Sequence, residues 1–280
     1  MGIRPRKAAV IGWPVWHSRS PAIFRHWLDR HGIEGSYERI AVPPDGIDAF
    51  LDGFAASGLV GANVTVPHKE AAFRHAVPDA AARAIGAVNT LWLEDGVLHG
   101  TNSDGDGFLR NLDEQAPGWS VGGRGALVIG AGGAARAIVH GLASRGVRPI
   151  AIANRTPERA GLLAAAFPTV AEAVAWDAIP REVARAGLVV NTTVLGMAGS
   201  PALDVDLSGA GPATVVADIV YVPLETPLLA SARARGLRTV DGLGMLLHQA
   251  AVGFEKWFGL RPAVDAALRE AILAEIGTRA

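Results

Sequence analysis

The chain has 280 residues, of which 50% are hydrophobic and 19% charged, a balance that excludes wholesale disorder and, at this length, predicts two lobes rather than one core. Its 26 basic and 27 acidic residues give a formal net charge of -1, so no long-range field favours nucleic acid or an anionic membrane surface. The absence of cysteine excludes disulfides and thiolate chemistry and agrees with a reducing cytoplasm.

The amino-terminal segment carries no targeting signal in its hydropathy. After the basic residues 4–7, only five apolar or small residues precede Trp13, too few for the core of a signal peptide. No apolar run reaches the roughly 20 residues of a membrane-spanning helix. We therefore expect a soluble, cytoplasmic protein with no membrane partner, and we predict neither nucleic acid binding nor a metal site.

Short apolar runs alternate with helical patterns from residue 8 onward, as in parallel strands joined by crossover helices. Residues 8–11 predict the first strand. Ser20-Pro21 predicts a helix start, with the serine oxygen capping free N–H groups and proline in the first turn. Apolar residues at positions 47, 50, 51 and 54 predict a helix that ends near Gly58.

Two strands and a hairpin complete the first lobe. Residues 37–42 and 62–66 predict strands, and Pro67 would stop the second strand and open a helix. Two extended runs then flank Asp95-Gly96, a dipeptide typical of two-residue hairpin turns. We expect the first lobe to end near residue 100.

The second lobe begins with a continuous apolar run, residues 125–129, followed at once by a glycine-rich turn and a helix that Gly146 closes. Thr156-Pro157 and Thr226-Pro227 repeat the cap-then-proline signature of a helix start. From residue 243 the pattern is helical, so we expect this tail to pack back on the first lobe. Further strands are predicted at residues 149–153, 188–190, 214–220 and 237–240.

The glycine-rich turn is a candidate nucleotide site. Gly130, Gly132 and Gly133 stand between a buried strand and a helix, where glycine lets the backbone approach a pyrophosphate at the positive helix N-terminus. Ala135 occupies the third small position of the common pattern, where only close packing is required. The glycines could instead serve only the conformation of the turn, and the turn alone does not decide between the two interpretations.

The end of the next strand indicates which dinucleotide would bind. An NAD enzyme needs Asp or Glu there for the ribose hydroxyl, but the chain reads Asn154-Arg155-Thr156-Pro-Glu-Arg159. Arg155 offers a planar fork of donors to a 2′-phosphate, and the neighbouring polar side chains add further donors. Alternatively, this segment is only a capped helix start with two solvated arginines. That interpretation does not explain why the Asp or Glu of an NAD enzyme is absent. The residues therefore favour NADP over NAD.

Three polar clusters of the first lobe fall at predicted loops or strand ends, at residues 17–21, 63–69 and 102–105. Ser20 and Asp104 could be helix caps, and Thr65 could be an ordinary strand residue. Lys69 is harder to explain structurally, because in the first turn of a helix opened by Pro67 the helix dipole disfavours a cation by about 0.3–1 kcal/mol. The same position favours a neutral amine, which a general acid/base lysine requires.

A series of short motifs runs along nearly the whole chain. The motifs are Gly12-Trp-Pro-Val-Trp-His-Ser-Arg-Ser-Pro21, Asn63-Val-Thr-Val-Pro-His-Lys69, Gly86-Ala-Val-Asn-Thr90, the Gly130 turn, Asn154-Arg-Thr156, Asn191-Thr-Thr193, Asp218-Ile-Val-Tyr221 and Gly242-Leu-Gly-Met-Leu-Leu-His-Gln249. In this order they resemble the shikimate dehydrogenase family. The resemblance implies a two-lobed α/β fold, with an N-terminal αβ substrate domain (residues 1–107 and 242–280), a Rossmann-like NADP-binding domain (residues 108–241), and C-terminal helices that pack back on the first lobe.

The resemblance also implies an activity, the reversible NADPH-dependent reduction of 3-dehydroshikimate to shikimate in aromatic amino acid (chorismate) biosynthesis. Lys69 and Asp104 would form the catalytic pair. The residues implied to bind substrate are Ser18, Ser20, Asn63, Thr65, Lys69, Asn89, Asp104, Tyr221 and Gln249. Those implied to bind NADP are Gly130, Ala131, Gly132, Gly133, Ala134, Asn154, Arg155, Thr156, Arg159, Thr192, Ile219 and Gly242.

Some of these positions have structural alternatives. Tyr221 could be a strand-end packing residue and Gln249 part of a solvated helix face, and only the resemblance favours the ligand. The chain departs from the family at Phe24-Arg25, where members usually have His-Asn, and at Ser103, where they usually have threonine. These departures bear on substrate preference more than on the type of reaction.

Two other functions remain to be weighed. One is a paralogue that acts on quinate or aminoshikimate, with NAD in place of NADP. The other is a non-catalytic NADP-binding sensor, against which Lys69 and Asp104 argue together, because a sensor has no use for a proton relay. We expect a monomer or a homodimer with a small-molecule substrate.

Overall fold

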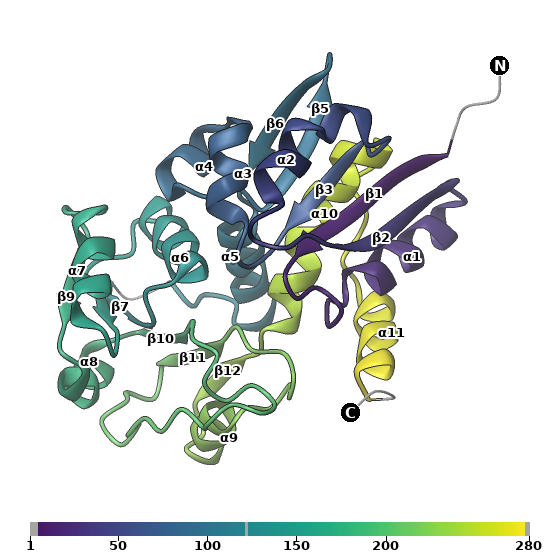
Figure 1. Cartoon of the computed structure of the whole chain (residues 1–280). Helices are drawn as coiled ribbons and strands as arrows, with labels where there is room; N and C mark the ends of the chain where they lie inside the picture. The colour runs from purple at the N-terminus through teal and green to yellow at the C-terminus, as the bar shows by residue number, and fades with distance from the viewer. Residues whose placement is uncertain (1–4, 121–122, 278–280) are drawn as a thin grey trace. The chain divides into compact units, whose positions relative to one another are not determined.

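Two six-stranded sheets organise the chain in the computed structural model, which describes residues 5–120 and 123–277 (Figure 1). Each sheet belongs to its own unit: one comprises residues 1–103 and 246–280, the other residues 104–245. The corresponding divisions predicted from the sequence are 107/108 and 241/242. Within the described ranges, no helix combines the length and the hydropathy needed to cross a membrane.

The sheet of the first unit is mixed. Its strand order is β2 (Gly35–Ala41), β1 (Arg6–Gly12), β3 (Gly61–Val64), β5 (Thr90–Glu94), β6 (Val97–Thr101) and β4 (Val77–Pro78). Strand β1 is parallel to β2 and β3, whereas β5 is antiparallel to β3 and β6. In chain order, β2 is added on one side of β1 and β3 on the other side. The direction in which strands are added therefore reverses at β1, and the carboxyl ends of β1 and β3 flank a topological switch point.

Helices cover both faces of this sheet. An aromatic cluster on one face joins α1 (Ser20–His31), β2 and α10 (Leu243–Phe258), and its members are Phe24, Trp27, Tyr37, Phe254, Trp257 and Phe258. The core on the other face contains α2 (Ile47–Asp52), the 3-10 turn Phe54–Ala56, α3 (Lys69–His75) and α4 (Ala80–Ile85). Helix α11 (Ala266–Gly277) contacts α1, so the predicted return of the tail to the first lobe is confirmed.

Gly61 lets α10 pack directly on β3. A Cβ at this position would overlap the indole of Trp257, which donates from Nε1 to the carbonyl of Leu91 at 2.8 Å. The last helices of the chain therefore complete the core of the first unit.

The predicted hairpin turn is confirmed, but the predicted cap of α1 is wrong. Asp95 (φ 51°) and Gly96 (φ 78°) both take the left-handed conformation of the expected two-residue turn. In α1, Arg19 is the N-cap, Ser20 is already helical, and no side chain caps the helix. Ser20 lies inside the helix rather than at its N-cap, so its hydroxyl does not serve the free N–H groups of α1.

Two further helix boundaries differ from the prediction. Helix α2 ends at Asp52 rather than near Gly58, because glycine at position 53, a weak helix former, interrupts it before the 3-10 turn. Helix α3 begins at Lys69 rather than at Pro67, because His68 first closes a turn by donating its N–H to the Thr65 carbonyl at 3.0 Å. Lys69 nevertheless lies in the first turn, as predicted.

The sheet of the second unit is wholly parallel. Its order is β12 (Arg238–Val240), β11 (Val215–Asp218), β10 (Leu188–Asn191), β7 (Ala126–Ile129), β8 (Ile150–Ala153) and β9 (Ala171–Val174). The four central strands are buried at every residue. Strand β9 was not predicted, because it is a short edge strand, only partly buried, whose alanines resemble the preceding helical pattern.

Helices pack on both faces of this sheet and enclose two apolar cores. They are α5 (Asp104–Gln115), α6 (Gly133–Ser144), α7 (Pro157–Ala165), the 3-10 turn Trp176–Ala178, α8 (Ile179–Arg185) and α9 (Pro227–Ala234). Thr156 and Thr226 are the N-caps predicted for α7 and α9. Read from β9, the strand order is that of a doubly wound nucleotide-binding sheet, whose switch point lies between β7 and β10. The predicted fold class is confirmed.

Candidate functional site

The glycine turn lies at the switch point of the parallel sheet. Gly130 follows β7 with φ +114°, a conformation that side chains rarely adopt. A Cβ there would overlap Thr192, which follows the neighbouring strand β10 and donates its hydroxyl to the Ile129 carbonyl at 2.8 Å. The structure therefore brings together two predicted cofactor residues, Gly130 and Thr192.

The amino terminus of α6 presents free donors. The first bond within the helix runs from Arg136 N to the Gly132 carbonyl at 3.1 Å, so the N–H groups of residues 133–135 have no acceptor in the helix. Gly132 and Gly133 are exposed, and a Cβ at either would meet nothing within 4 Å. Free N–H groups, the positive end of the helix dipole and open space suit a pyrophosphate. The predicted cofactor residues of this segment are Ala131, Gly132, Gly133 and Ala134.

Exposed basic and polar side chains follow β8. Arg155, Thr156 and Arg159 are exposed, and the half-buried Asn154 donates from its amide to the Thr156 carbonyl at 2.9 Å. Within residues 5–120 and 123–277, neither arginine forms an ion pair with an acidic side chain. Two guanidinium groups without an acidic partner, at the strand end where the ribose would lie, fit the 2′-phosphate of NADP.

Ile219 directly follows β11, and Gly242 lies just after β12, the neighbouring strand of the same sheet. The two residues are in contact. The N–H of Ile219 donates to the Asn191 carbonyl at 3.1 Å, and a Cβ at Gly242 would overlap the Ile219 carbonyl. The N–H of Gly242 donates to the Val220 carbonyl at 3.3 Å. Tyr221, which is half-buried, extends the same segment.

A buried carboxylate fixes the loops that carry these residues. Asp218 is 1% exposed and accepts from Asn191 Nδ2 at 3.0 Å, from Val220 N at 2.9 Å and from Thr226 Oγ1 at 2.8 Å. Burial raises the pKa of Asp218, and the three hydrogen bonds oppose that shift. Asn191 ends β10 and Asp218 ends β11, so the network ties the two strand ends to each other and to α9. No role was predicted for this network from the sequence. Asn191 and Asp218 each end an apolar strand, and this pattern was a usable signal that the two polar side chains lie close together.

In the first unit, side chains of β2 hold the predicted serine segment. Ser18 Oγ accepts from Ser20 N at 3.3 Å, and Arg39 donates twice to the Ser18 carbonyl, at 3.0 and 2.6 Å. Ser20 is buried near Tyr37, and its hydroxyl opposes the rise that burial causes in the pKa of that phenol. Sequence reasoning missed Tyr37 and Arg39, although their i, i+2 spacing in a predicted strand indicated a shared face.

Asn63 lies at the centre of a buried polar network. Its Oδ1 accepts from the Tyr37 hydroxyl at 2.6 Å, and its Nδ2 donates to the Asn89 carbonyl at 3.3 Å and to Thr90 Oγ1 at 3.2 Å. The nearby Thr65 is half-buried, and its N–H donates to the Ile11 carbonyl at 2.9 Å. The ends of β1 and β3 therefore hold the predicted substrate residues of two clusters in one framework.

Asn89 connects this framework to α10. Its Oδ1 accepts from Ser103 N at 2.9 Å, and its Nδ2 donates to Gln249 Oε1 at 3.4 Å. Ser103 donates its hydroxyl to the Gln249 carbonyl at 3.2 Å. Two predicted substrate residues, Asn89 and Gln249, are thus in contact. Ser103, where the family usually has threonine, uses its hydroxyl within the same network.

Lys69 begins α3 in a half-buried position. Its carbonyl accepts from Val88 N at 2.9 Å, and the adjacent buried imidazole of His68 lies 2.7 Å from the Val42 carbonyl through Nε2. These bonds anchor the start of the helix that carries the amine. Asp104, a buried residue that begins α5, and Tyr221 belong to the second unit, whereas Lys69 belongs to the first.

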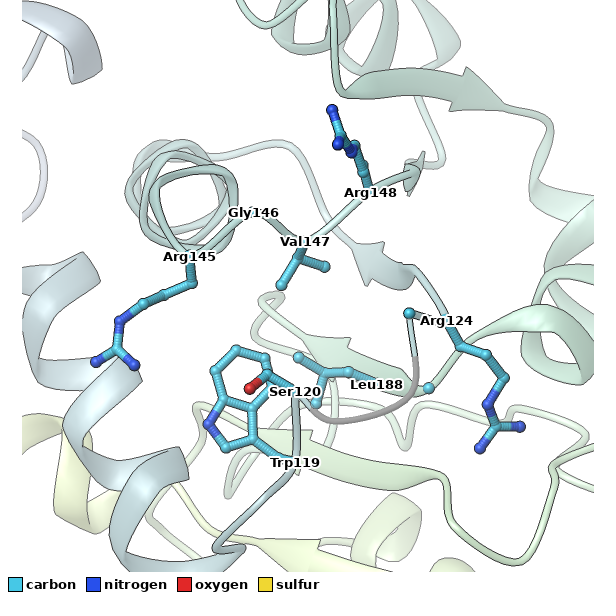
Figure 2. Close-up of a pocket in the computed structure, with 10 residues that line it drawn as sticks. Trp119, Ser120, Arg124, Arg145, Gly146, Val147, Arg148 and Leu188 are labelled. Carbon is cyan, nitrogen blue, oxygen red and sulfur yellow. The ribbon is translucent and has the colours of Figure 1, made fainter.

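The second unit also has a pocket at the amino-terminal end of its sheet, opposite the strand ends that carry the glycine turn (Figure 2). Leu188 lines it and begins β10, whose other end carries Asn191 and Thr192. The guanidinium groups at positions 124, 145 and 148 point away from the pocket, so it does not form an anion site. In the part of the chain that the structure describes, no cluster of three His, Asp or Glu side chains could hold a metal ion.

Comparison with known proteins identifies three family matches along the chain. Residues 10–91 match the shikimate dehydrogenase substrate binding domain, residues 113–197 match shikimate/quinate 5-dehydrogenase, and residues 242–272 match the shikimate 5′-dehydrogenase C-terminal domain. These matches span both units, and the third covers the helical tail that returns to the first unit.

Individual relatives agree with the family matches. The chain is 54% identical over 275 residues to the shikimate dehydrogenase (NADP(+)) of Azorhizobium caulinodans, covering 98% of each chain. The shikimate 5-dehydrogenase of Thermus thermophilus, solved in complex with NADP(H) and shikimate, is 36% identical with a TM-score of 0.85, covering 96% of this chain and 99% of that one. The quinate dehydrogenase of Corynebacterium glutamicum, in complex with NAD, is 31% identical with a TM-score of 0.89 over the same shares.

Proposed function

The chain belongs to the shikimate dehydrogenase family, and on this premise we propose that it catalyses the reversible NADPH-dependent reduction of 3-dehydroshikimate to shikimate. The observation that carries the cofactor assignment is the pair of exposed arginines, Arg155 and Arg159, beside the open glycine turn at the switch point of a doubly wound sheet. The enzyme is an NADP-dependent oxidoreductase of the shikimate pathway.

When bound, NADPH would supply a hydride to the C3 carbonyl of the substrate. As the carbonyl carbon is reduced, its oxygen becomes an alkoxide and requires a proton donor within hydrogen-bond reach. Lys69 donates that proton from Nζ in the proposed mechanism and recovers it in the reverse direction. Asp104 orients the amine and accepts a hydrogen bond from a substrate hydroxyl.

The remaining predicted residues bind and orient the substrate. Ser18, Ser20 and Thr65 offer hydroxyls, and Asn63, Asn89 and Gln249 offer amides that both donate and accept. Such groups suit a small acid with several ring hydroxyls. The hydrogen-bonded framework of the first unit supports this assignment, because it holds the three amide side chains in fixed orientations before any ligand arrives. Tyr221 completes the proposed set from the second unit.

In the second unit, the turn at residues 130–134 and Asn154, Arg155, Thr156 and Arg159 bind the pyrophosphate and the 2′-phosphate in this proposal. Thr192, Ile219 and Gly242 flank the nicotinamide. Gly130 and Gly242 support these assignments, because a Cβ at Gly130 would overlap Thr192 and one at Gly242 would overlap the Ile219 carbonyl, so both positions require backbone alone.

The proposed function is tested by following the reduction of NADP spectrophotometrically with shikimate as substrate, and then with quinate and with NAD. We expect turnover with shikimate and NADP to exceed turnover with every other pair. Preference for quinate and NAD would favour the second candidate, to which the resemblance to the Corynebacterium glutamicum enzyme points. We further propose a cytoplasmic monomer or homodimer, which mass measurement in solution distinguishes.

A further inference from the structure

We propose that Tyr37 is a positioning residue for the substrate, whose buried hydroxyl donates to Asn63 and holds that side chain in the orientation in which it binds. The inference deepens the proposed function and rests on it, because Asn63 is proposed to contact shikimate. Tyr37 itself lies in the middle of β2, away from the strand ends that carry the predicted site.

The sheet register explains how a residue of β2 reaches a residue of β3. Tyr37 pairs with Ala8 of β1, and Asn63 pairs with Val10, two residues further along the same strand. Paired residues and residues two apart share one face of a sheet. The phenol therefore crosses β1 above the small side chain of Ala8, and its oxygen lies 2.6 Å from Asn63 Oδ1.

The direction of each hydrogen bond follows from the available donors. The Asn89 carbonyl can only accept, so the group of Asn63 that faces it is Nδ2, and Asn63 Oδ1 faces Tyr37. The phenol must then donate to Oδ1. The result is a directed chain from the Tyr37 hydroxyl through Asn63 to the Asn89 carbonyl.

Packing and burial hold the phenol in this role. The ring of Tyr37 stacks on Phe24 with centroids 3.8 Å apart and planes 10° apart. Phe24 is the residue that stands where the family usually has histidine. Burial raises the pKa of Tyr37 well above its usual value, so the hydroxyl keeps its proton and remains a donor. Arg39, two residues along the same face, holds the Ser18 carbonyl, and together these side chains make β2 a support for the loop after β1.

The test replaces the hydroxyl alone. Tyr37→Phe keeps the stack on Phe24 but removes the hydrogen bond to Asn63, so we expect KM for shikimate to rise roughly three- to tenfold, the effect of one hydrogen bond. KM for NADP should stay within about twofold, and kcat should change less than KM for shikimate. Trp27→Phe is the matched control, because it removes a part-buried hydrogen bond to the Ala263 carbonyl (3.1 Å) in the same aromatic cluster without touching Asn63.

A double variant separates positioning from a general loss of packing. If Tyr37 acts in part through Asn63, Tyr37→Phe should raise KM for shikimate less in an Asn63→Ala background than in the unmodified protein. Fully additive effects, an unchanged KM in Tyr37→Phe, or an equal rise in Trp27→Phe would each overturn the inference. Failure of the unmodified protein to oxidise shikimate would overturn the proposed function instead, and the inference with it.

A measurement on the unmodified side chain avoids any dependence on the folding of variants. The chain has only two tyrosines, so protein labelled with ring-13C tyrosine gives two sets of ring signals, and Tyr221→Phe identifies those of Tyr37. Shikimate added without NADP should shift the Tyr37 signals as Asn63 engages the ligand. Tyr37 signals that stay unchanged at saturating shikimate would overturn the inference.

Discussion

Lys69 is a cationic side chain at the first position of a helix, where the dipole opposes it. We expect Lys69→Ala to lower kcat about 10²- to 10⁴-fold, the usual contribution of a positioned acid or base, with a smaller effect on KM for shikimate. Steady-state kinetics measures both quantities.

The matched control is Lys256→Ala, which removes an exposed amine lying 4.3 Å from the centroid of Trp92 in the same unit. It should leave kcat unchanged. Turnover that survives Lys69→Ala would contradict the assigned proton donor.

Asp218 should make stability depend on pH in a direction unusual for a carboxylate. Its pKa is raised in the folded protein, so from about pH 4 upward, near the unfolded pKa, the folded state binds more protons than the unfolded state. Stability then falls as pH rises through this window. In urea unfolding between pH 4 and 7, the free energy of unfolding of the unmodified protein should fall relative to that of Asp218→Asn as pH rises. A difference that moves the other way would contradict the burial effect.

The close packing at the turn after β7 makes a prediction at the scale of an element. Gly130→Ala would place a Cβ against Thr192 in a conformation of positive φ, so we expect a loss of about 1–3 kcal/mol in stability and a raised KM for NADP. Gly161→Ala is the matched control, because it lies within α7 with nothing within 4 Å of its new Cβ. Removing that helical glycine should stabilise by about 0.5–1 kcal/mol. Thermal unfolding that shows the same sign for both variants would contradict the assignment.

Strong local signals made most elements predictable from the sequence. Asp95-Gly96 and Thr226-Pro227 place a hairpin turn and a helix start because their chemistry is decided within a few residues. The cap predicted at Ser20 is wrong because Arg19 holds the N-cap position and Ser20 is already helical, a shift of one residue that the local sequence does not decide. Strand β9 was not predicted because it lies on a half-exposed edge of the sheet, where the alternation of apolar and polar residues is weak.

The candidate site divides in the same way. Glycine turns, caps and the arginines after β8 are legible in the sequence because each works through neighbouring residues. The sequence marks Tyr37, Asn191 and Asp218 only as polar residues in or directly after predicted strands, and it does not reveal their contacts, because their partners come from other strands and only the sheet register brings them together. Supporting residues of this kind are therefore found from structure, even where the ligand-facing residues are found from motifs.

At the scale of the whole molecule, the two units divide the proposed ligands between them. Most of the proposed substrate residues belong to the first unit, and the proposed NADP residues to the second. A ligand at 100 times its Kd stabilises the state that binds it by about 2.7 kcal/mol. We expect hydrogen exchange to show that shikimate alone mainly protects residues 5–103 and 246–277, and that NADP alone mainly protects residues 123–245. Uniform protection by either ligand would contradict this division.

The indole of Trp257, seated over Gly61, has a consequence during synthesis on the ribosome. The first unit lacks part of its aromatic core until residues 246–277 have been translated, whereas the second unit is continuous and is complete once residue 245 has emerged. The nascent chain can therefore finish its nucleotide-binding half first, while the half that begins the polypeptide waits for the last helices to close it.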